Sequence, residues 1–352
     1  MMNAIRSPTS SIPDHAIDIH CLMTSDTHGS QSGAMFSIGT HSLFLSIGGV
    51  ARRTGEPLVI FLAGAGDVAS SYVTVERLVG TFAPVVLYDR SGLGRSQDGP
   101  MKPTATTAAT ELHQLLHSAD LTPPLLLVAH SYGGIVAREY LHLYPEEVAG
   151  MVLADASTER QAELLDDPDL DINAVLGDLK FSQVTGLRDS AQLSRDEWRA
   201  RAADIARGLP TSQAESAAAI EVCKTLGSKE QYRNQALGVR PLSVIRCRGS
   251  QDYQRIYEKG VEAGNGTEAQ RAAFRRLLAR WDQYDQRAQA EQLRLSSNSR
   301  LTYLPDCGHH VHLIRPDVVA FEIRWVRDQI LEKSNLPWRS DYRPDGDSKI
   351  SS

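Results

Sequence analysis

The sequence has few cysteines and no paired cysteine motif. Only Cys21, Cys223, Cys247 and Cys307 occur in 352 residues, and no two of them form a CxxC pair. This spacing excludes a zinc ribbon and a dense disulfide framework. We therefore expect reduced thiols.

Long apolar runs and basic stripes are also missing. No stretch approaches the roughly 18 apolar residues that cross a bilayer, and the first twenty residues lack the basic start and apolar run of a secretory signal. A net charge of −6 argues against nucleic acid or an anionic membrane surface as a partner. These absences predict a cytoplasmic protein without membrane insertion, and they leave its oligomeric state open.

What the chain does contain is a series of short apolar runs separated by helical patterns. Hydrophobic residues make up 41% of the chain, enough for a substantial core. After a strand or hairpin at residues 37–47, the runs lack polar alternation, which is typical of parallel strands buried on both faces. They predict an α/β fold with a doubly wound, mostly parallel sheet. The runs are Pro57–Leu62, Val85–Tyr88, Leu125–Ala129, Met151–Ala154, Leu242–Arg246 and Leu301–Leu304.

The character of the sequence changes after the fourth of these runs, Met151–Ala154. Residues 157–235 are rich in Ala, Glu, Arg and Gln with helical periodicity and no strand-like run, which predicts an inserted helical cap. The core then comprises residues 35–156 and 236–334, with further helices near 265–293 and 318–332. Residues 1–34 and 335–352 are polar and turn-forming, and we expect flexible ends.

The strongest local signal is a serine between an apolar strand and a helix. In LLLVAHSYGGIVAREY, Ser131 follows the strand that ends at Ala129, and Gly133 is small enough to let strand and helix approach. A sharp turn here exposes the serine hydroxyl and places the Tyr132 N–H at a helix N-terminus, where it can stabilise an oxyanion. A serine before a glycine is otherwise most often a helix cap. The flanking strand and helix favour a nucleophile.

A glycine-rich loop follows an earlier strand. VIFLAGAGD carries Ala63, Gly64, Ala65 and Gly66 directly after apolar residues 58–62. It lacks the Lys-Ser/Thr ending of a P-loop and the full spacing of a dinucleotide fingerprint, so we expect no cofactor. Ala65 N–H is our candidate for the second oxyanion donor.

A histidine cluster lies late in the chain. LPDCGHHVHLIRP offers His309, with His310 and His312 as rivals for the role of general base. His309 follows a glycine in the loop between the last strand and the closing helix. Three histidines can hold a metal, but no carboxylate or cysteine lies at ligand spacing from them. The sequence therefore predicts no metal.

Two aspartates compete for the acid that orients the histidine. Asp155 follows the apolar run that ends at Ala154, and Asp252 lies near the end of the next one. Both are predicted to be carboxylates in loops that can support an imidazole. The simpler interpretations are a helix cap for Asp155 and a solvated turn residue for Asp252. Residue spacing alone does not decide which of the two aspartates is the acid.

Together these segments resemble the α/β-hydrolase superfamily, closely over residues 55–160 and loosely over 240–330. The resemblance rests on AGAGD, YDRSGLGRS, AHSYGG, YPEEVAGMVLADAS and GHHVHLIRPD. In that family the second motif is structural, and its Asp89 and Arg90 tie loops beside the site. The family's acid usually lies nine residues after the proline that opens the seventh strand, which from Pro241 gives Ser250. Some members carry the acid after the sixth strand, and this favours Asp155 over Asp252.

The resemblance implies a serine hydrolase with a Ser131–His309–Asp155 triad. Such an enzyme would cleave an ester, lactone, thioester or amide bond of a small acyl substrate with water. A serine at the elbow argues against the epoxide hydrolases and dehalogenases of the superfamily, which use an aspartate. A non-hydrolytic enzyme for C–C cleavage or cyclisation, and a ligand-binding member with a vestigial triad, are the alternatives.

Overall fold

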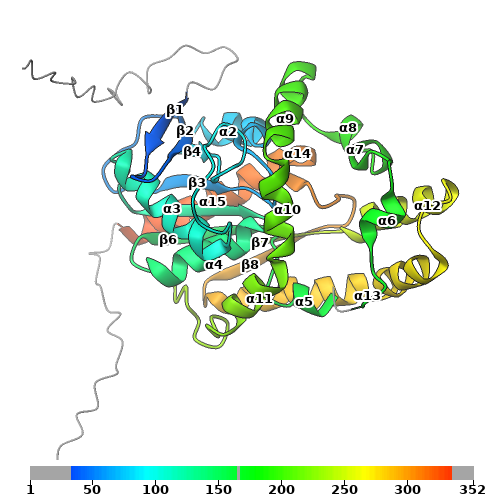
Figure 1. Ribbon diagram of the computed structural model, residues 1–352. Helices are drawn as coiled ribbons and strands as arrows, with labels where there is room; N and C mark the ends of the chain where they lie inside the picture. The colour runs from blue at the N-terminus through cyan, green and yellow to red at the C-terminus, as the bar shows by residue number, and fades with distance from the viewer. Residues whose placement is uncertain (1–32, 165–166, 335–352) are drawn as a thin grey trace, which may run out of the picture.

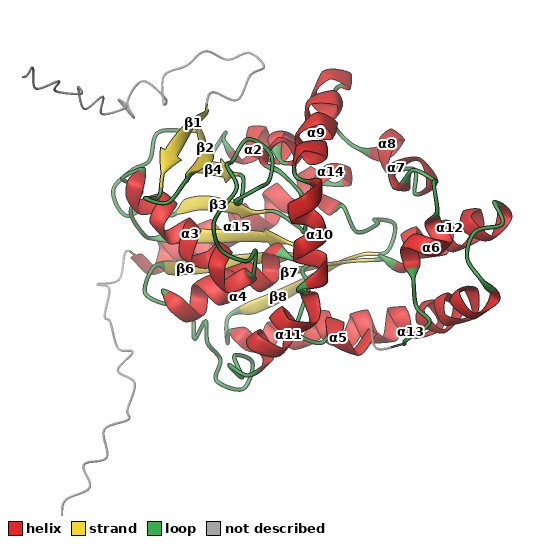
Figure 2. Ribbon diagram, in the orientation of Figure 1, coloured by secondary structure: helices red, strands yellow, loops and turns green. Residues whose placement is uncertain are grey.

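The computed structural model describes residues 33–164 and 167–334, and within them an eight-stranded sheet forms the centre of the molecule (Figures 1 and 2). The spatial order is β1-β2-β4-β3-β5-β6-β7-β8, so the chain crosses over between β2 and β5. The strands are β1 (Gly33–Ser37), β2 (Ser42–Gly49), β3 (Leu58–Leu62), β4 (Pro84–Tyr88), β5 (Leu125–His130), β6 (Val148–Ala154), β7 (Leu242–Cys247) and β8 (Ser299–Leu304).

The first two strands form an antiparallel hairpin at one edge, and the remaining strands run parallel. The hairpin corrects one boundary of the sequence analysis. Residues 33 and 34 belong to β1, where Gly33 pairs with Ser46, and do not belong to a flexible segment. The other residues of the two expected flexible ends, 1–32 and 335–352, lie outside the described part of the chain.

Helices cover both faces of the sheet. On one face α3 (Ala105–Ser118) and α4 (Gly133–Leu143) pack on a buried cluster that includes Leu62, and on the other α2 (Val73–Val79) and α15 (Pro316–Ser334) pack on a second cluster. Every residue of β3, β4, β5 and β6 is buried, as expected for strands that read as unbroken apolar runs. The doubly wound fold is therefore confirmed.

The last strand departs from the buried pattern. β8 forms the free edge of the sheet, and its Leu301 and Tyr303 are 42% and 44% exposed. The apolar run at residues 301–304 correctly predicted a strand, but the prediction that this strand is buried on both faces was wrong. An edge strand has a neighbour on one side only, so part of its surface stays in contact with solvent.

Residues 157–235 contain only helices and connecting segments among the described residues, as the sequence predicted. A second helical segment, residues 250–292 between β7 and β8, packs against these cap helices. Residues of both segments share a third hydrophobic cluster that includes Val175 and Phe274. The helices of the two segments are α5 (Gln161–Leu164), α6 (Ile172–Leu176), α7 (Phe181–Val184), α8 (Leu187–Ser190), α9 (Arg195–Arg207), α10 (Leu209–Ala217), α11 (Ala219–Gly227), α12 (Ser250–Glu262) and α13 (Glu268–Gln292).

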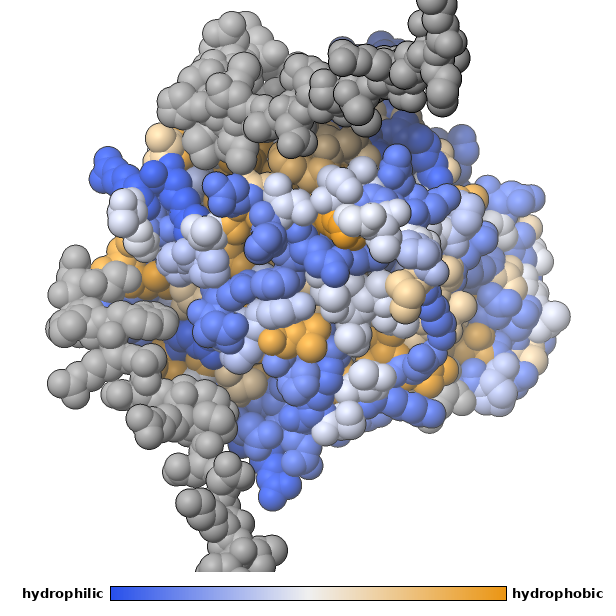
Figure 3. Space-filling model, turned by 60° about the vertical axis from the view of Figure 1, so that its left-hand side comes forward, coloured by the Kyte–Doolittle hydropathy of each residue, from blue (hydrophilic) through white to orange (hydrophobic). Residues whose placement is uncertain are grey.

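Short helical turns complete the fold: η1 (Ala69–Ser71), η2 (Leu293–Leu295) and α14 (Val311–Ile314). Hydrophilic residues cover most of the face seen in Figure 3, and hydrophobic residues form separate patches on it. Among the described helices, none combines the length and the apolar character that a membrane crossing requires. Cys223, Cys247 and Cys307 are buried free thiols, as predicted, whereas Cys21 lies outside the described residues.

Candidate active site

Ser131 lies at the turn between β5 and α4 with a backbone φ of +51°. A residue other than glycine rarely adopts this left-handed conformation, and a strained serine at a strand-to-helix turn is the geometry of a nucleophile elbow. A Cβ on Gly133 would lie 2.1 Å from the Leu62 carbonyl oxygen, so only glycine fits there. The Ser157 N–H donates to the Ser131 carbonyl oxygen at 2.9 Å, which holds the turn from the opposite side.

Two backbone donors flank the serine. Tyr132 directly precedes α4, and the first N–H groups of a helix have no partner within the helix. In the loop after β3, Gly66 N–H donates to Glu215 Oε2 at 2.8 Å and Asp67 N–H donates to the Gly64 carbonyl oxygen at 3.1 Å. Ala65 is exposed, and its N–H donates to no acceptor among the described residues. Both N–H groups that the sequence suggested are thus available to a ligand.

His309 lies in the loop between β8 and α14, and its ring contacts Asp155. The Nδ1 atom is 2.6 Å from Asp155 Oδ2, and 30% of the histidine side chain remains exposed. Burial works against the charged imidazole, but the hydrogen bond and the negative charge of Asp155 outweigh it and raise the pKa of His309. Because Nδ1 contacts Asp155, Nε2 is the ring nitrogen that remains to accept or donate a proton.

The histidine loop also contacts the elbow. The His309 carbonyl oxygen is 2.9 Å from Nε2 of His130, the residue before Ser131. A Cβ on Gly64 would meet both His130 Nδ1 at 3.1 Å and Ser131 Cβ at 3.3 Å. Three segments therefore converge at the carboxyl ends of β3, β5 and β8. They are the elbow at Ser131, the glycine-rich loop of residues 63–66, called the oxyanion loop below, and the histidine loop.

Asp155 is fixed by the neighbouring strand. It has φ +46°, its N–H donates to the Ile245 carbonyl oxygen at 2.7 Å, and its Oδ1 accepts the Cys247 N–H at 2.8 Å. Oδ2 then points to His309. Aspartate tolerates the left-handed region better than most residues, and here the end of β7 holds it there.

Asp252 supports the same histidine through its backbone. Its Oδ2 accepts the His309 N–H at 2.9 Å, so it positions the loop while Asp155 contacts the ring. The expectation of a carboxylate in a loop was wrong for this residue, because Asp252 lies in the first turn of α12 and is 6% exposed. Burial raises the pKa of Asp252, although the His309 N–H and imidazole partly oppose this.

A buried ion pair that the sequence analysis missed connects the cap to the oxyanion loop. Arg90 donates to Oε1 of Glu215, on α10, at 2.8 Å and to the carbonyl oxygens of Ala63 and Gly64 at 2.7 Å each. Asp89 accepts N–H groups from Ala69 and Arg95, so the implied structural role of Asp89 and Arg90 is confirmed. Nothing in the cap sequence distinguishes Glu215 from its other glutamates.

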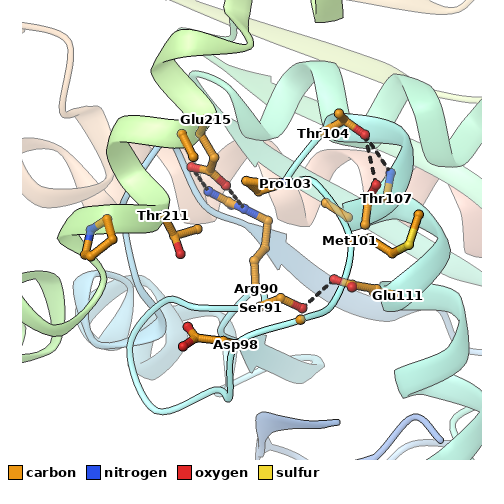
Figure 4. Close-up of a pocket in the computed structure, with 14 residues that line it drawn as sticks. Arg90, Ser91, Asp98, Met101, Pro103, Thr104, Thr107, Glu111, Thr211 and Glu215 are labelled. Carbon is orange, nitrogen blue, oxygen red and sulfur yellow. Dashed lines mark hydrogen bonds and ion pairs between the residues drawn. The ribbon is translucent and has the colours of Figure 1, made fainter. Parts of the chain in front are cut away.

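A cavity of about 280 Å³ lies beside this ion pair, between the segment that follows β4, α3 and α10 (Figure 4). Arg90 and Glu215 line it together with Ser91, which donates to Glu111 Oε2 at 2.5 Å. Because Arg90 also contacts the oxyanion loop, the Arg90–Glu215 pair is a wall common to the cavity and the site.

Replacing Glu215 by glutamine is expected to destabilise the protein by about 3–5 kcal/mol, because the Arg90 charge stays buried without its counterion. Urea unfolding followed by circular dichroism measures the loss. Glu262→Gln is the matched control, since Glu262 pairs with Lys259 on the exposed surface of α12 and should change nothing measurable. Equal stability of the two variants would contradict the structural role of Glu215.

His310 and His312, the rivals of His309, do not contact Asp155 in the described structure. His312 is buried, its Nε2 lies 3.4 Å from Asp67 Oδ2, and its ring stacks on Tyr72 with centroids 4.4 Å apart. Burial lowers the pKa of both histidines, and neighbouring imidazoles add to this for His310. These rings are therefore neutral at physiological pH.

Comparisons with known proteins agree with the fold. The profile of the Alpha/beta hydrolase family matches residues 59–322. A protein of Gibberella zeae named "AB hydrolase superfamily protein" is 30% identical over 298 residues, which cover 81% of this chain and 90% of that protein. A thermophilic esterase from Thermogutta terrifontis superposes with a TM-score of 0.52 at 16% identity and covers 85% of this chain and 99% of its own.

A longer relative matches as well. A protein of Hormonema carpetanum named "Probable transporter efuK" is 27% identical over 319 residues, which cover 88% of this chain and 45% of that protein. The chain therefore spans less than half the length of that relative.

The chain belongs to the alpha/beta hydrolase family. Membership supports a hydrolase-type function.

Proposed function

We propose that the protein is a serine hydrolase that cleaves an ester, lactone, thioester or amide bond of a small molecule through an acyl-enzyme on Ser131. His309 acts as general base and acid, and Asp155 orients it. The proposal rests above all on one observation. The Nδ1 atom of His309 lies 2.6 Å from Asp155 Oδ2, in a loop that contacts the residue next to a serine with φ +51°.

In this mechanism His309 Nε2 takes the proton of Ser131 Oγ while Oγ attacks the carbonyl carbon of the substrate. The negative charge that develops on the carbonyl oxygen is held by the N–H groups of Ala65 and Tyr132, and Asp155 stabilises the imidazolium. His309 then gives the proton to the leaving group as the C–O, C–S or C–N bond breaks. Water repeats the steps on the acyl-enzyme and releases the acid.

A series of chromogenic esters with increasing acyl length, run on the full chain, tests the reaction. We expect turnover, and we expect a fluorophosphonate probe to label Ser131, as identified by mass spectrometry of the labelled peptide. Turnover without labelling, or labelling at another residue, would refute the acyl-enzyme on Ser131. Labelling without turnover of any ester or matching amide would refute hydrolysis and favour another reaction in this pocket.

The pH dependence of kcat/KM should show an acidic limb with its midpoint above 6.5. His309 must be neutral to accept a proton, and Asp155 raises its pKa, so activity rises with pH through that raised pKa. The negative charge of Asp252 also contributes to the raised pKa. In Asp252→Asn the limb should therefore move to lower pH. A midpoint below 6.5 in the unaltered protein would contradict the His309–Asp155 contact.

A further inference from the structure

Beside the proposed triad, three other imidazoles meet in the interior. His130 comes from the end of β5, whereas His310 and His312 come from the histidine loop and α14. One ring nitrogen of each lies within 4.8 Å of those of the other two. His130 and His312 are 3% and 1% exposed, so this is a buried cluster.

Each of the three rings has a buried Nδ1 without a hydrogen-bond partner among the described residues. A buried polar atom that is left unpaired costs about 1–3 kcal/mol, so such atoms call for an explanation. The three unpaired atoms belong to rings that are neighbours in the fold. Part of the space beside His130 Nδ1 exists because residue 64 is a glycine, where a Cβ would approach to 3.1 Å.

The opposite nitrogens of two rings face oxygen atoms. His130 Nε2 is 2.9 Å from the His309 carbonyl oxygen, and His312 Nε2 is 3.4 Å from Asp67 Oδ2. Histidines that bind metals typically donate their second N–H to a carbonyl or carboxylate oxygen, which fixes the tautomer and leaves the other nitrogen free. His130 already has this arrangement, whereas His312 Nε2 lies near Asp67 Oδ2 without a hydrogen bond between the two atoms.

The ring centres, rather than the nitrogens, have the spacing of a metal site. Nitrogens on a tetrahedral zinc are about 3.3 Å apart, so the rings, whose nitrogens lie within 4.8 Å of one another, turn toward the ion on binding. With a Zn–N bond of about 2 Å, three imidazoles on a tetrahedral zinc have their ring centres about 5 Å apart. The centroids of His130 and His312 are 4.3 Å apart, those of His130 and His310 5.7 Å, and those of His310 and His312 5.8 Å.

We propose that His130, His310 and His312 bind a divalent transition-metal ion, zinc in the first place, through one ring nitrogen of each. Asp67 is a positioning residue that holds His312 and offsets part of the positive charge, and a water molecule completes the coordination. Neutral nitrogen ligands select zinc, copper or nickel over calcium and magnesium. Residue spacing had predicted no metal because His130 and Asp67 are far from the histidine loop in sequence and meet it only in the fold.

Equilibrium dialysis of the metal-stripped full chain against Zn²⁺, and titration with Co²⁺ followed by its visible absorption, test the site. We expect a zinc ion whose binding is lost in His310→Asn, and four-coordinate cobalt absorption that disappears with it. His310 is only partly buried, so this variant should fold. In Asp67→Asn zinc affinity should fall by about 10- to 100-fold, as for other outer partners of metal ligands.

His117→Asn, at an exposed position of α3, is the matched control and should bind zinc like the unaltered chain. Histidines and Cys21 outside the described residues can also take up metal, so the difference between variants decides the outcome. Equal zinc binding in His310→Asn and in the control, or no binding by the unaltered chain, would overturn the proposal. Neither measurement depends on catalysis, so this result and the test of the hydrolase function are independent.

Discussion

Replacement of Ser131 by alanine is expected to lower kcat by about 10³- to 10⁶-fold, as in other enzymes that lose a triad nucleophile. Without Oγ no acyl-enzyme forms, whereas the Ala65 and Tyr132 N–H groups can still polarise a bound carbonyl. The residual rate should therefore exceed that of the uncatalysed reaction. Steady-state hydrolysis of the best ester in the series measures the loss.

Ser228→Ala is the control for this variant, because Ser228 is an exposed serine that follows α11 and donates to the Thr225 carbonyl oxygen. It should keep full turnover and full labelling by the fluorophosphonate. Circular dichroism checks that both variants are folded. Turnover by folded Ser131→Ala within about tenfold of the unaltered protein would rule out the nucleophile.

Asp155→Asn is expected to lower kcat by about 10⁴-fold, because an amide next to His309 Nδ1 stabilises the wrong tautomer of the imidazole. Asp252→Asn should cost about tenfold or less, since its amide oxygen can still accept the His309 N–H that the carboxylate accepts at 2.9 Å. The same ester, measured at saturating concentration, gives both values.

The two substitutions are matched in size and chemistry, and both residues are buried, so their ratio separates the two roles. A larger loss in Asp252→Asn than in Asp155→Asn would transfer the role of the acid to Asp252. Similar small losses in both would show that His309 needs no acid.

The parts of the site that follow a strand could be predicted from the sequence. An apolar run fixes where a buried strand ends, and in a parallel sheet the carboxyl ends of the strands share one edge. Ser131, Ala65 and Asp155 each come within three residues of such an end, and the structure brings them to that edge. His309 was placed by its position between the last strand and the closing helix.

The contacts between distant segments could not be predicted in this way. Glu215 lies on a cap helix whose periodicity says which face is polar but not which partner that face meets. The support that Asp252 gives to the His309 backbone depends on α12 beginning at Ser250, a boundary that the polar letters after β7 do not define. In the sequence His130 is distinguished only by its place before Ser131, and its proximity to His312 follows from the packing of the histidine loop.

The hydrogen bond between Ser157 N–H and the Ser131 carbonyl oxygen bears on how the family can diversify. The chain enters the cap immediately after Asp155, and at Ser157 it is still attached to the elbow. An exchange of the helices beyond this point leaves serine, histidine and acid on the core side of the junction. The incoming cap must still supply a carboxylate for Arg90, as Glu215 does here, so the cover of the pocket can be replaced only together with that counterion.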